Sequence, residues 1–270
     1  MPLLIVRGWV RRIFTFTTID ASDARGVNGA GQIVGSGYLK DGETYTPLDF
    51  AAHGINDTEQ IVGFFSDGTY IHGVIKDGNI ITTFDVPGAF SQTHAMGING
   101  VGDIVGWYDD SSGGTHGFLR QGNTYISFDV PGARNTYASG INNAGQIVGH
   151  FSGASGSHSF LKDGSTFMTV DVPGANFTEA YGINDAGQIV GTFQDISGEH
   201  GFLATPSLGG SVTGMSPTTG RVTCRNLTTK KTVRITMPVG GRSWNCEQAG
   251  LVVNPGDEIQ QTMTVIGPAD

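Results

Sequence analysis

Residues 140–174 read GINNAGQIVGHFSGASGSHSFLKDGSTFMTVDVPG, and near-copies of this stretch recur along the chain. In each copy Gly-Ile/Val-Asn is followed by a form of Gln-Ile-Val-Gly, then usually His-Gly/Ser-Phe-Leu, Lys-Asp-Gly and Phe-Asp-Val-Pro-Gly. Five glycines start these copies at spacings of 28, 43, 43 and 42 residues: Gly26, Gly54, Gly97, Gly140 and Gly182. Self-similarity at a period of about 20 to 50 residues indicates a repeat architecture.

Each copy predicts four short strands joined by tight turns. Turn signals such as Asn-Asp-Ala-Gly at 184–187 and Lys-Asp-Gly at 162–164 separate runs rich in β-branched residues, and no segment has a helical period. Four strands in about 43 residues is the size of one β-propeller blade.

The two ends of the repeat array predict how it closes. The fifth copy stops after His-Gly-Phe-Leu at 200–203, whereas residues 16–20 near the N-terminus look like its missing fourth strand. We therefore expect an all-β fold: a five-bladed β-propeller over residues 14–206, closed by the N-terminal strand, with no long open sheet edge. An open solenoid of the same units is the alternative.

These motifs resemble a bacterial extracellular repeat family named for its His-Ala-Phe (HAF) signature. The resemblance rests on the Gly-Ile-Asn, Gln-Ile-Val-Gly and His-Gly-Phe segments and covers nearly all of residues 14–206. The chain departs from the signature by carrying Gly or Ser at its central position. The resemblance implies an extracellular or cell-surface location and no settled activity.

The composition disfavours two classes of partner, nucleic acids and the membrane interior. The 270 residues carry a formal charge of −9 and no basic cluster interleaved with aromatics, which disfavours nucleic acid. No apolar run reaches the length of a membrane-spanning helix, so we expect no transmembrane segment. The apolar residues 2–6 precede Arg7, Arg11 and Arg12 rather than follow them, so a signal peptide is not evident.

The composition shifts after residue 206, which predicts a second domain. Alternating stretches in residues 207–270 indicate a small β-sandwich-like domain that attaches the protein to a surface or caps the propeller. Its two cysteines, Cys224 and Cys246, suit a disulfide and hence an oxidising compartment, with two free thiols as the alternative.

Residues repeated in every unit are expected to hold the units together. We expect His72, His116, His158 and His200 to bond neighbouring strands or turns. The aspartates before Val-Pro-Gly and the asparagines of Gly-Ile-Asn should fix turns. If these sites instead bind sugar, the protein is a multivalent lectin with one pocket per blade.

Positions that differ between units favour one central site. Three residues before each repeat glycine stand Asp23, Ala51, His94, Tyr137 and Glu179. One residue before each glycine stand Arg25, His53, Met96, Ser139 and Tyr181. We expect both columns at one mouth of a central channel, although a freely drifting, solvent-exposed column would look the same.

These residue types predict hydrolytic chemistry. Asp23 and Glu179 become neighbours once the ring closes and could hold Ca²⁺, which would polarise an ester or lactone carbonyl while His94 or a carboxylate activates water. The residues expected to contact the substrate are Tyr137, Tyr181, Arg25 and His53. No organic cofactor is expected.

The function that this site predicts is that of a secreted propeller hydrolase acting on a small ester or lactone, or on a glycoside. The chain has no Gly-x-Ser-x-Gly elbow, which disfavours a common serine hydrolase. Residues 107–110 (Trp-Tyr-Asp-Asp) are expected in an exposed hairpin tip, with a sugar-stacking or cation-binding surface as the alternative. The alternative function is a non-enzymatic, lectin-like propeller that binds glycan or protein.

Overall fold

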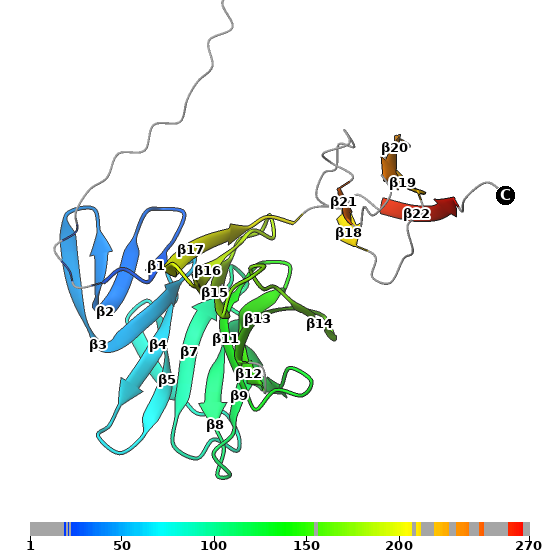
Figure 1. The fold of residues 1–270 in the computed structure, drawn as a ribbon. Coiled ribbons are helices and arrows are strands. Elements are labelled where there is room, and N and C mark those ends of the chain that lie inside the picture. Colours follow the sequence, from blue (N-terminus) through cyan, green and yellow to red (C-terminus); the bar gives the residue numbers. More distant parts are fainter. Residues whose placement is uncertain are drawn as a thin grey trace, which may run out of the picture.

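The computed structural model describes residues 19, 21, 23–153 and 156–206, followed by the strand segments 209–211, 219–226, 231–237, 243–245 and 259–266. Every regular element in these residues is a β-strand, which confirms the all-β prediction (Figure 1). The described residues contain no helix with the length and hydrophobicity needed to cross a bilayer. The predicted closing strand at 16–20 lies outside them, apart from Ile19.

The repeats that start at Gly26, Gly54, Gly97, Gly140 and Gly182 are named units 1 to 5. Units 1 and 2 share one antiparallel sheet of six strands in chain order: β1 (Gly26–Val27), β2 (Ile33–Asp41), β3 (Thr44–Ile55), β4 (Ile61–Ser66), β5 (Ile71–Asp77) and β6 (Ile80–Phe84). Strand β3 belongs to both units, because its first half pairs with β2 and its second half pairs with β4. The short spacing between the first two repeats therefore corresponds to a shortened unit 1.

Units 3 and 4 have the full set of four strands each. Unit 3 contains β7 (Thr93–Ile98), β8 (Ile104–Asp109), β9 (Thr115–Gln121) and β10 (Thr124–Phe128). Unit 4 contains β11 (Asn135–Ile141), β12 (Ile147–Gly153), β13 (Gly156–Asp163) and β14 (Thr166–Thr169). A short parallel contact between β9 and β11 joins the two units into one sheet. Unit 5 has three described strands: β15 (Phe177–Ile183), β16 (Ile189–Asp195) and β17 (Gly198–Ala204).

A β-bulge interrupts the first strand of units 2 to 5 at the residue before the repeat glycine. The strand register shifts there in all four units. The glycine of Gln-Ile-Val-Gly lies opposite the bulge, and a Cβ on Gly106 would come within 1.8 Å of the His94 carbonyl oxygen. The repeated glycine is therefore required by a close approach of two backbones.

The asparagine of Gly-Ile-Asn links each unit to the next. Its Nδ2 donates to the backbone carbonyl of the following unit's asparagine, at 3.0 Å from Asn56 to Asn99 and 3.1 Å from Asn142 to Asn184. Its Oδ1 accepts from the backbone of its own turn, as Asn142 does from the Gln146 amide at 2.9 Å. These bonds confirm the predicted turn-fixing role and add a contact between units.

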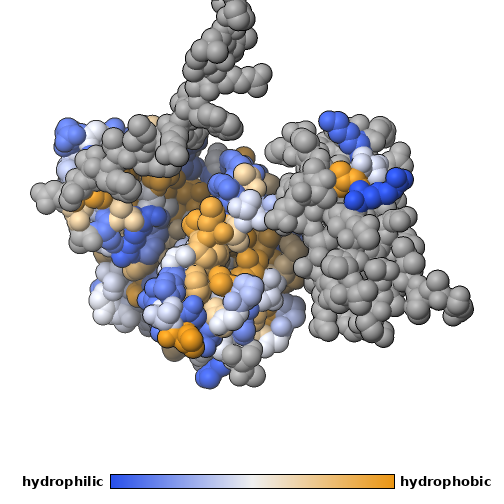
Figure 2. Space-filling view, turned by 45° about the horizontal axis from the view of Figure 1, so that its top comes forward, coloured by the Kyte–Doolittle hydropathy of each residue, from blue (hydrophilic) through white to orange (hydrophobic). Residues whose placement is uncertain are grey.

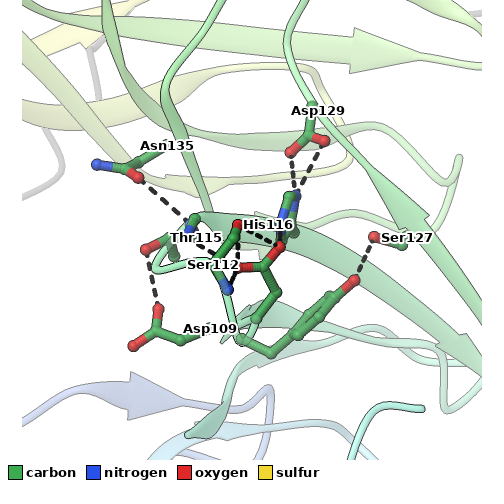
Figure 3. Close-up of polar contacts among 10 residues, drawn as sticks. Asp109, Ser112, Thr115, His116, Ser127, Asp129 and Asn135 are labelled. Atoms are coloured by element: carbon green, nitrogen blue, oxygen red, sulfur yellow. Dashed lines mark hydrogen bonds and ion pairs between the residues drawn. The ribbon is translucent and has the colours of Figure 1, made fainter. Parts of the chain in front are cut away.

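The repeated histidines join the third strand of their unit to the residues that follow its fourth strand. Figure 3 shows His116 of β9 beside Asp129, which follows β10, and their closest atoms lie 2.9 Å apart. The other ring nitrogen of His116 lies 3.2 Å from Oδ2 of Asp110. Matching pairs join His72 to Asp85 and His158 to Asp171. The predicted structural role of these histidines and aspartates is confirmed.

Apolar residues fill the boundaries between successive units. The valine of Gln-Ile-Val-Gly, as at Val62 or Val105, packs against the first three strands of the next unit. Val34 and Val148 do the same in units 1 and 4. All four valines are completely buried, so the core lies between units as well as within them.

The segment after residue 206 also forms strands where it is described. Strand β18 (Gly209–Ser211) pairs with β21 (Ser243–Asn245), and β19 (Thr219–Asn226) lies between β20 (Thr232–Met237) and β22 (Ile259–Ile266), all antiparallel. Cys246 and the side chain of Cys224 are outside the described residues, so the predicted disulfide stays a prediction.

Candidate functional site

A cavity of about 450 Å³ lies where the first strands of the five units come together. Every unit contributes at least one lining residue, and most are aromatic or imidazole rings. The lining residues are Arg25, His53, Met96, Trp107, Tyr137, Ser139, His150 and Tyr181.

The bulges explain how the residues before the repeat glycines reach the cavity in units 2 to 5. The whole column of residues that precede the repeat glycines, from Arg25 to Tyr181, lines it. In units 2 to 5 these residues stand at the register shift, which turns a side chain out of the strand's regular alternation. Arg25, His53, Tyr137 and Tyr181, predicted to contact a substrate, all line this cavity.

Six rings form a continuous series of contacts beside the cavity. Their centroids are 5.1 Å apart for His53 and Phe64, 4.2 Å for Phe64 and His94, 3.9 Å for His94 and Trp107, 5.4 Å for Trp107 and Tyr137, and 4.7 Å for Tyr137 and His150. Two of these contacts are cross-strand pairs with nearly parallel rings, His94 with Trp107 and Tyr137 with His150. Trp107 therefore lies within strand β8, and the prediction that it sits in an exposed hairpin tip is wrong.

A partly buried ion pair between Arg25 and Asp23 lies next to His53, the first ring of the series. The Arg25 Nε donates to Asp23 Oδ2 at 2.5 Å, and a guanidinium nitrogen of Arg25 contacts Nε2 of His53. The Ser36 amide and hydroxyl each donate to Asp23 at 2.9 Å. The amide hydrogen bond, followed by the hydroxyl and Arg25, holds the pKa of Asp23 below its usual value.

A second group of hydrogen-bonded side chains lies on unit 5, where Tyr181 lines the cavity. The Tyr181 hydroxyl donates to Glu179 Oε2 at 2.9 Å and lies 3.1 Å from Thr192 Oγ1. Burial, followed by the hydrogen bond to Glu179, raises the pKa of Tyr181. Tyr181 therefore keeps its proton and orients the carboxylate of Glu179.

The histidines beside the cavity are neutral at pH 7. Burial lowers the pKa of both His53 and His94 to about 4, and the positive charge of Arg25 adds to the effect at His53. Burial also lowers the pKa of His150, although the negative charge of Glu179 acts in the opposite direction.

His150 is the side chain best placed for proton transfer. It lines the cavity, and neither of its ring nitrogens has a hydrogen-bond partner among the described residues; Nδ1 is buried, so Nε2 is the nitrogen that a water in the cavity can reach. Such an unsatisfied buried nitrogen is uncommon in a folded protein. Tyr137 stacks on one face of the ring and fixes its plane.

The predicted catalytic residues are arranged differently from the expectation. His94 is 7% exposed, its Nε2 is bonded to Gln92 Oε1 at 3.0 Å, and it does not line the cavity. Among the described residues no contact joins Asp23 to Glu179, because Asp23 is engaged by Ser36 and Arg25. Within the same residues, no group of three or more His, Cys, Asp or Glu side chains could hold a metal ion.

The sequence analysis did not predict His150, because both of the columns compared between units lie on the first strand of each unit. The residue after Gln-Ile-Val-Gly varies as strongly between units as the columns considered: Ser36, Phe64, Trp107, His150 and Thr192. In units 2 to 5 it pairs directly with the residue three before the repeat glycine. That variability was the available signal.

No protein-family model matches the chain, and no curated protein matches its sequence significantly. Solved structures with some likeness include a streptogramin B lyase (TM-score 0.43, 11% identity, covering 93% of this chain and 96% of the other). A protein proposed to be a gluconolactonase has a TM-score of 0.37 at 12% identity, covering 85% and 82%. A triple-arginine mutant of AofleA from Arthrobotrys oligospora has a TM-score of 0.35 at 10% identity, covering 91% and 90%. Likeness at this level leaves the activity to be argued from the chain itself.

Proposed function

We propose that residues 14–206 form a five-bladed β-propeller whose central channel contains the cavity. Two observations support the ring: side chains from all five units line the cavity, and the same asparagine and valine contacts join each unit to the next. The N-terminal strand at 16–20 completes unit 5, and residues 207–270 form a separate domain for surface attachment.

The cavity is the active site of a hydrolase that acts on a small ester or lactone. The observation that carries this proposal is His150, a neutral imidazole on the cavity wall without a hydrogen-bond partner among the described residues. A neutral imidazole can take a proton from water as the water attacks a carbonyl carbon, and the imidazolium can return that proton to the alkoxide oxygen as the acyl C–O bond breaks. The negative charge of Glu179 favours the imidazolium that forms.

Arg25 supplies positive charge across the cavity. Its guanidinium can stabilise the oxyanion that develops on the carbonyl oxygen, a role that the sequence assigned to Ca²⁺. Calcium is the second source of charge that the sequence predicts, and its binding by Asp23 and Glu179 would require Asp23 to leave Ser36 and Arg25 and to approach Glu179. Among the described lining residues there is no carboxylate, which favours an ester or lactone over a glycoside, since glycosidases generally use two.

A secreted or surface location is part of the proposal and rests on the repeat resemblance. Trp107, Tyr137 and Met96 give the cavity an apolar wall, so small apolar acyl groups are the expected substrates.

The test is hydrolysis of a panel of 4-nitrophenyl esters, five- and six-membered lactones and 4-nitrophenyl glycosides. We expect turnover of at least one ester or lactone, and a loss of about 100-fold or more in kcat/KM in His150→Gln. His200→Gln, which changes a histidine on β17 away from the cavity, should retain activity. No turnover of any ester or lactone, or full activity in His150→Gln, would overturn the proposal.

A further inference from the structure

A second hollow, of about 190 Å³, lies at the boundary between units 2 and 3, away from the central cavity. It is lined by the loop before β5, the start of β5 and the segment between β6 and β7. Its aromatic lining residues are Tyr70 and Phe90, which are 47% and 64% exposed. At this volume it is smaller than the roughly 300–1,000 Å³ of pockets for drug-sized ligands, so a single ring is the right size of ligand.

The repeat itself shows that these aromatic residues are not required by the fold. Tyr70 stands two residues before the repeated histidine, His72. The equivalent positions in units 3 to 5 are occupied by Gly114, Gly156 and Gly198. The position of Phe90, two residues after Pro-Gly, is occupied by Arg134 and Asn176 at the next two boundaries. Both aromatic residues line the same hollow, although one comes from the loop before β5 and the other from the segment between β6 and β7.

The rim of the hollow is held by backbone bonds between the units. The Ile71 amide donates to the Ser91 carbonyl at 3.0 Å, and the Phe90 amide donates to the Asp109 carbonyl at 2.8 Å. The Gln92 side chain is fixed from two sides, by Asp109 and His94. The aromatic residues are therefore presented from a rigid frame, which reduces the entropy lost when a ligand binds.

Polar groups in the hollow remain open to a ligand. The Asp85 side chain is 53% exposed, and its carboxylate is oriented by Nδ1 of His72 at 2.9 and 3.0 Å. A carboxylate has about four acceptor sites, so the histidine leaves some of them free. Among the described residues, the Ser91 hydroxyl has no hydrogen-bond partner.

We propose that this hollow binds one pyranose ring of a glycan. The apolar C–H face of a pyranose suits Phe90 and Tyr70, whereas its hydroxyls can donate to Asp85 and exchange hydrogen bonds with Ser91. The sugar site is then confined to one boundary of the repeat array, in contrast to a lectin with equal pockets in every blade. It is separate from the hydrolytic cavity and does not depend on the function proposed there.

The test is saturation-transfer NMR of the full chain with methyl glycosides of α-D-mannose, β-D-galactose, β-D-glucose and α-L-fucose. We expect transfer to at least one glycoside with a millimolar Kd. Tyr70→Gly and Phe90→Asn, which introduce the residues found in other units, should each weaken binding about tenfold or more.

Arg134→Ala, at the position equivalent to Phe90 on the next boundary, is the matched control and should bind as the wild type does. Unchanged melting temperatures of the Tyr70 and Phe90 variants exclude loss through unfolding. No transfer to any of the four glycosides, or binding that persists in both variants, would overturn the proposal. Loss of binding in Arg134→Ala would overturn its confinement to one boundary.

Discussion

Val148 and Val190 occupy the same position in units 4 and 5, yet Val148 is completely buried whereas Val190 is 49% exposed. Val148 is covered by Ala180 and Ile189 of the following unit. The corresponding leading face of unit 1 is also open, because Val27 is 66% exposed while its equivalent Ile98 in unit 3 is 9% exposed. Figure 2 shows hydrophobic residues gathered in the middle of one face of the described units.

The open faces are those of Val190 in unit 5 and Val27 in unit 1. At the boundaries between the other units, equivalent apolar residues pack against one another and are buried. A closed ring would bring the two open faces together and would give the side chain of Asn184 the carbonyl of Asn28 to bond, as Asn142 bonds Asn184. Burial of the two faces would stabilise the closed ring, since the hydrophobic free energy scales with apolar area.

Ring closure predicts that Val190→Asp destabilises the protein. A carboxylate would be buried without a partner at the closed boundary, so we expect a loss of about 3 kcal/mol or more in the free energy of unfolding. Urea unfolding followed by circular dichroism measures it. Val148→Asp should cost as much, and Ile196→Asp, at a fully exposed position, should cost almost nothing. A Val190→Asp protein as stable as wild type would mean that the ring is open.

Arg25 should control the affinity for calcium. Its guanidinium pairs with Asp23 and repels any cation held by Asp23 and Glu179. We therefore expect Arg25→Ala to bind Ca²⁺ more tightly than wild type in a calorimetric titration of chelator-treated protein. Arg25→Ala combined with Asp23→Ala and Glu179→Ala is the control and should bind no more tightly than wild type. Equal affinity with and without the two carboxylates would show that they are not the ligands.

The repeat pattern predicted the strands well because it samples each turn and strand several times. Gly-Ile-Asn and Lys-Asp-Gly specify local turns, whose hydrogen bonds include ones between residues close in sequence, as from the Gln146 amide to Asn142. The fusion of two units through β3 was less predictable, because the pairing of Ser36 with Ala51 across a register shift involves contacts distant in sequence.

The site was predicted only in part for a similar reason. The column from Arg25 to Tyr181 is visible in the sequence, because unlike residues interrupt a strict repeat. The burial of His94 between Phe64 and Trp107 depends on the second strand of two units, so its exclusion from the cavity follows from packing. The pairing of Asp23 with Arg25 likewise competes with the predicted pairing of Asp23 with Glu179. The sequence contains all three charged residues but does not show which of them are in contact.

If His150 is the base, activity should fall at acid pH. Burial lowers the pKa of His150, so the free enzyme keeps a neutral imidazole to a pH below the usual value of 6.5. We expect kcat/KM on an ester to be constant near neutral pH and to decline tenfold per pH unit below that pKa. Glu179→Gln removes the charge that favours the imidazolium and should move the decline to still lower pH. A decline that starts above pH 6.5 would contradict the assignment.

Stability should fall between pH 6.5 and 4 because of the buried histidines. The folded pKa of His94 is about 4, so in this window the unfolded chain binds a proton that the folded protein does not. At about 1.4 kcal/mol for each pKa unit, the folded state loses about 3 kcal/mol from His94 across the window. His94→Phe keeps a flat ring between Phe64 and Trp107, and its stability should depend less on pH.

His72 provides a control of opposite sign. Its hydrogen bond to Asp85 raises the pKa of His72, so its contribution is present below pH 6.5 and is lost as pH rises through the raised pKa. His72→Asn should therefore destabilise the protein more at pH 5.5 than at pH 8.5, as measured by urea unfolding at both pH values. If His94→Phe and His72→Asn changed the pH dependence in the same direction, the two histidines would not differ in protonation as their surroundings require.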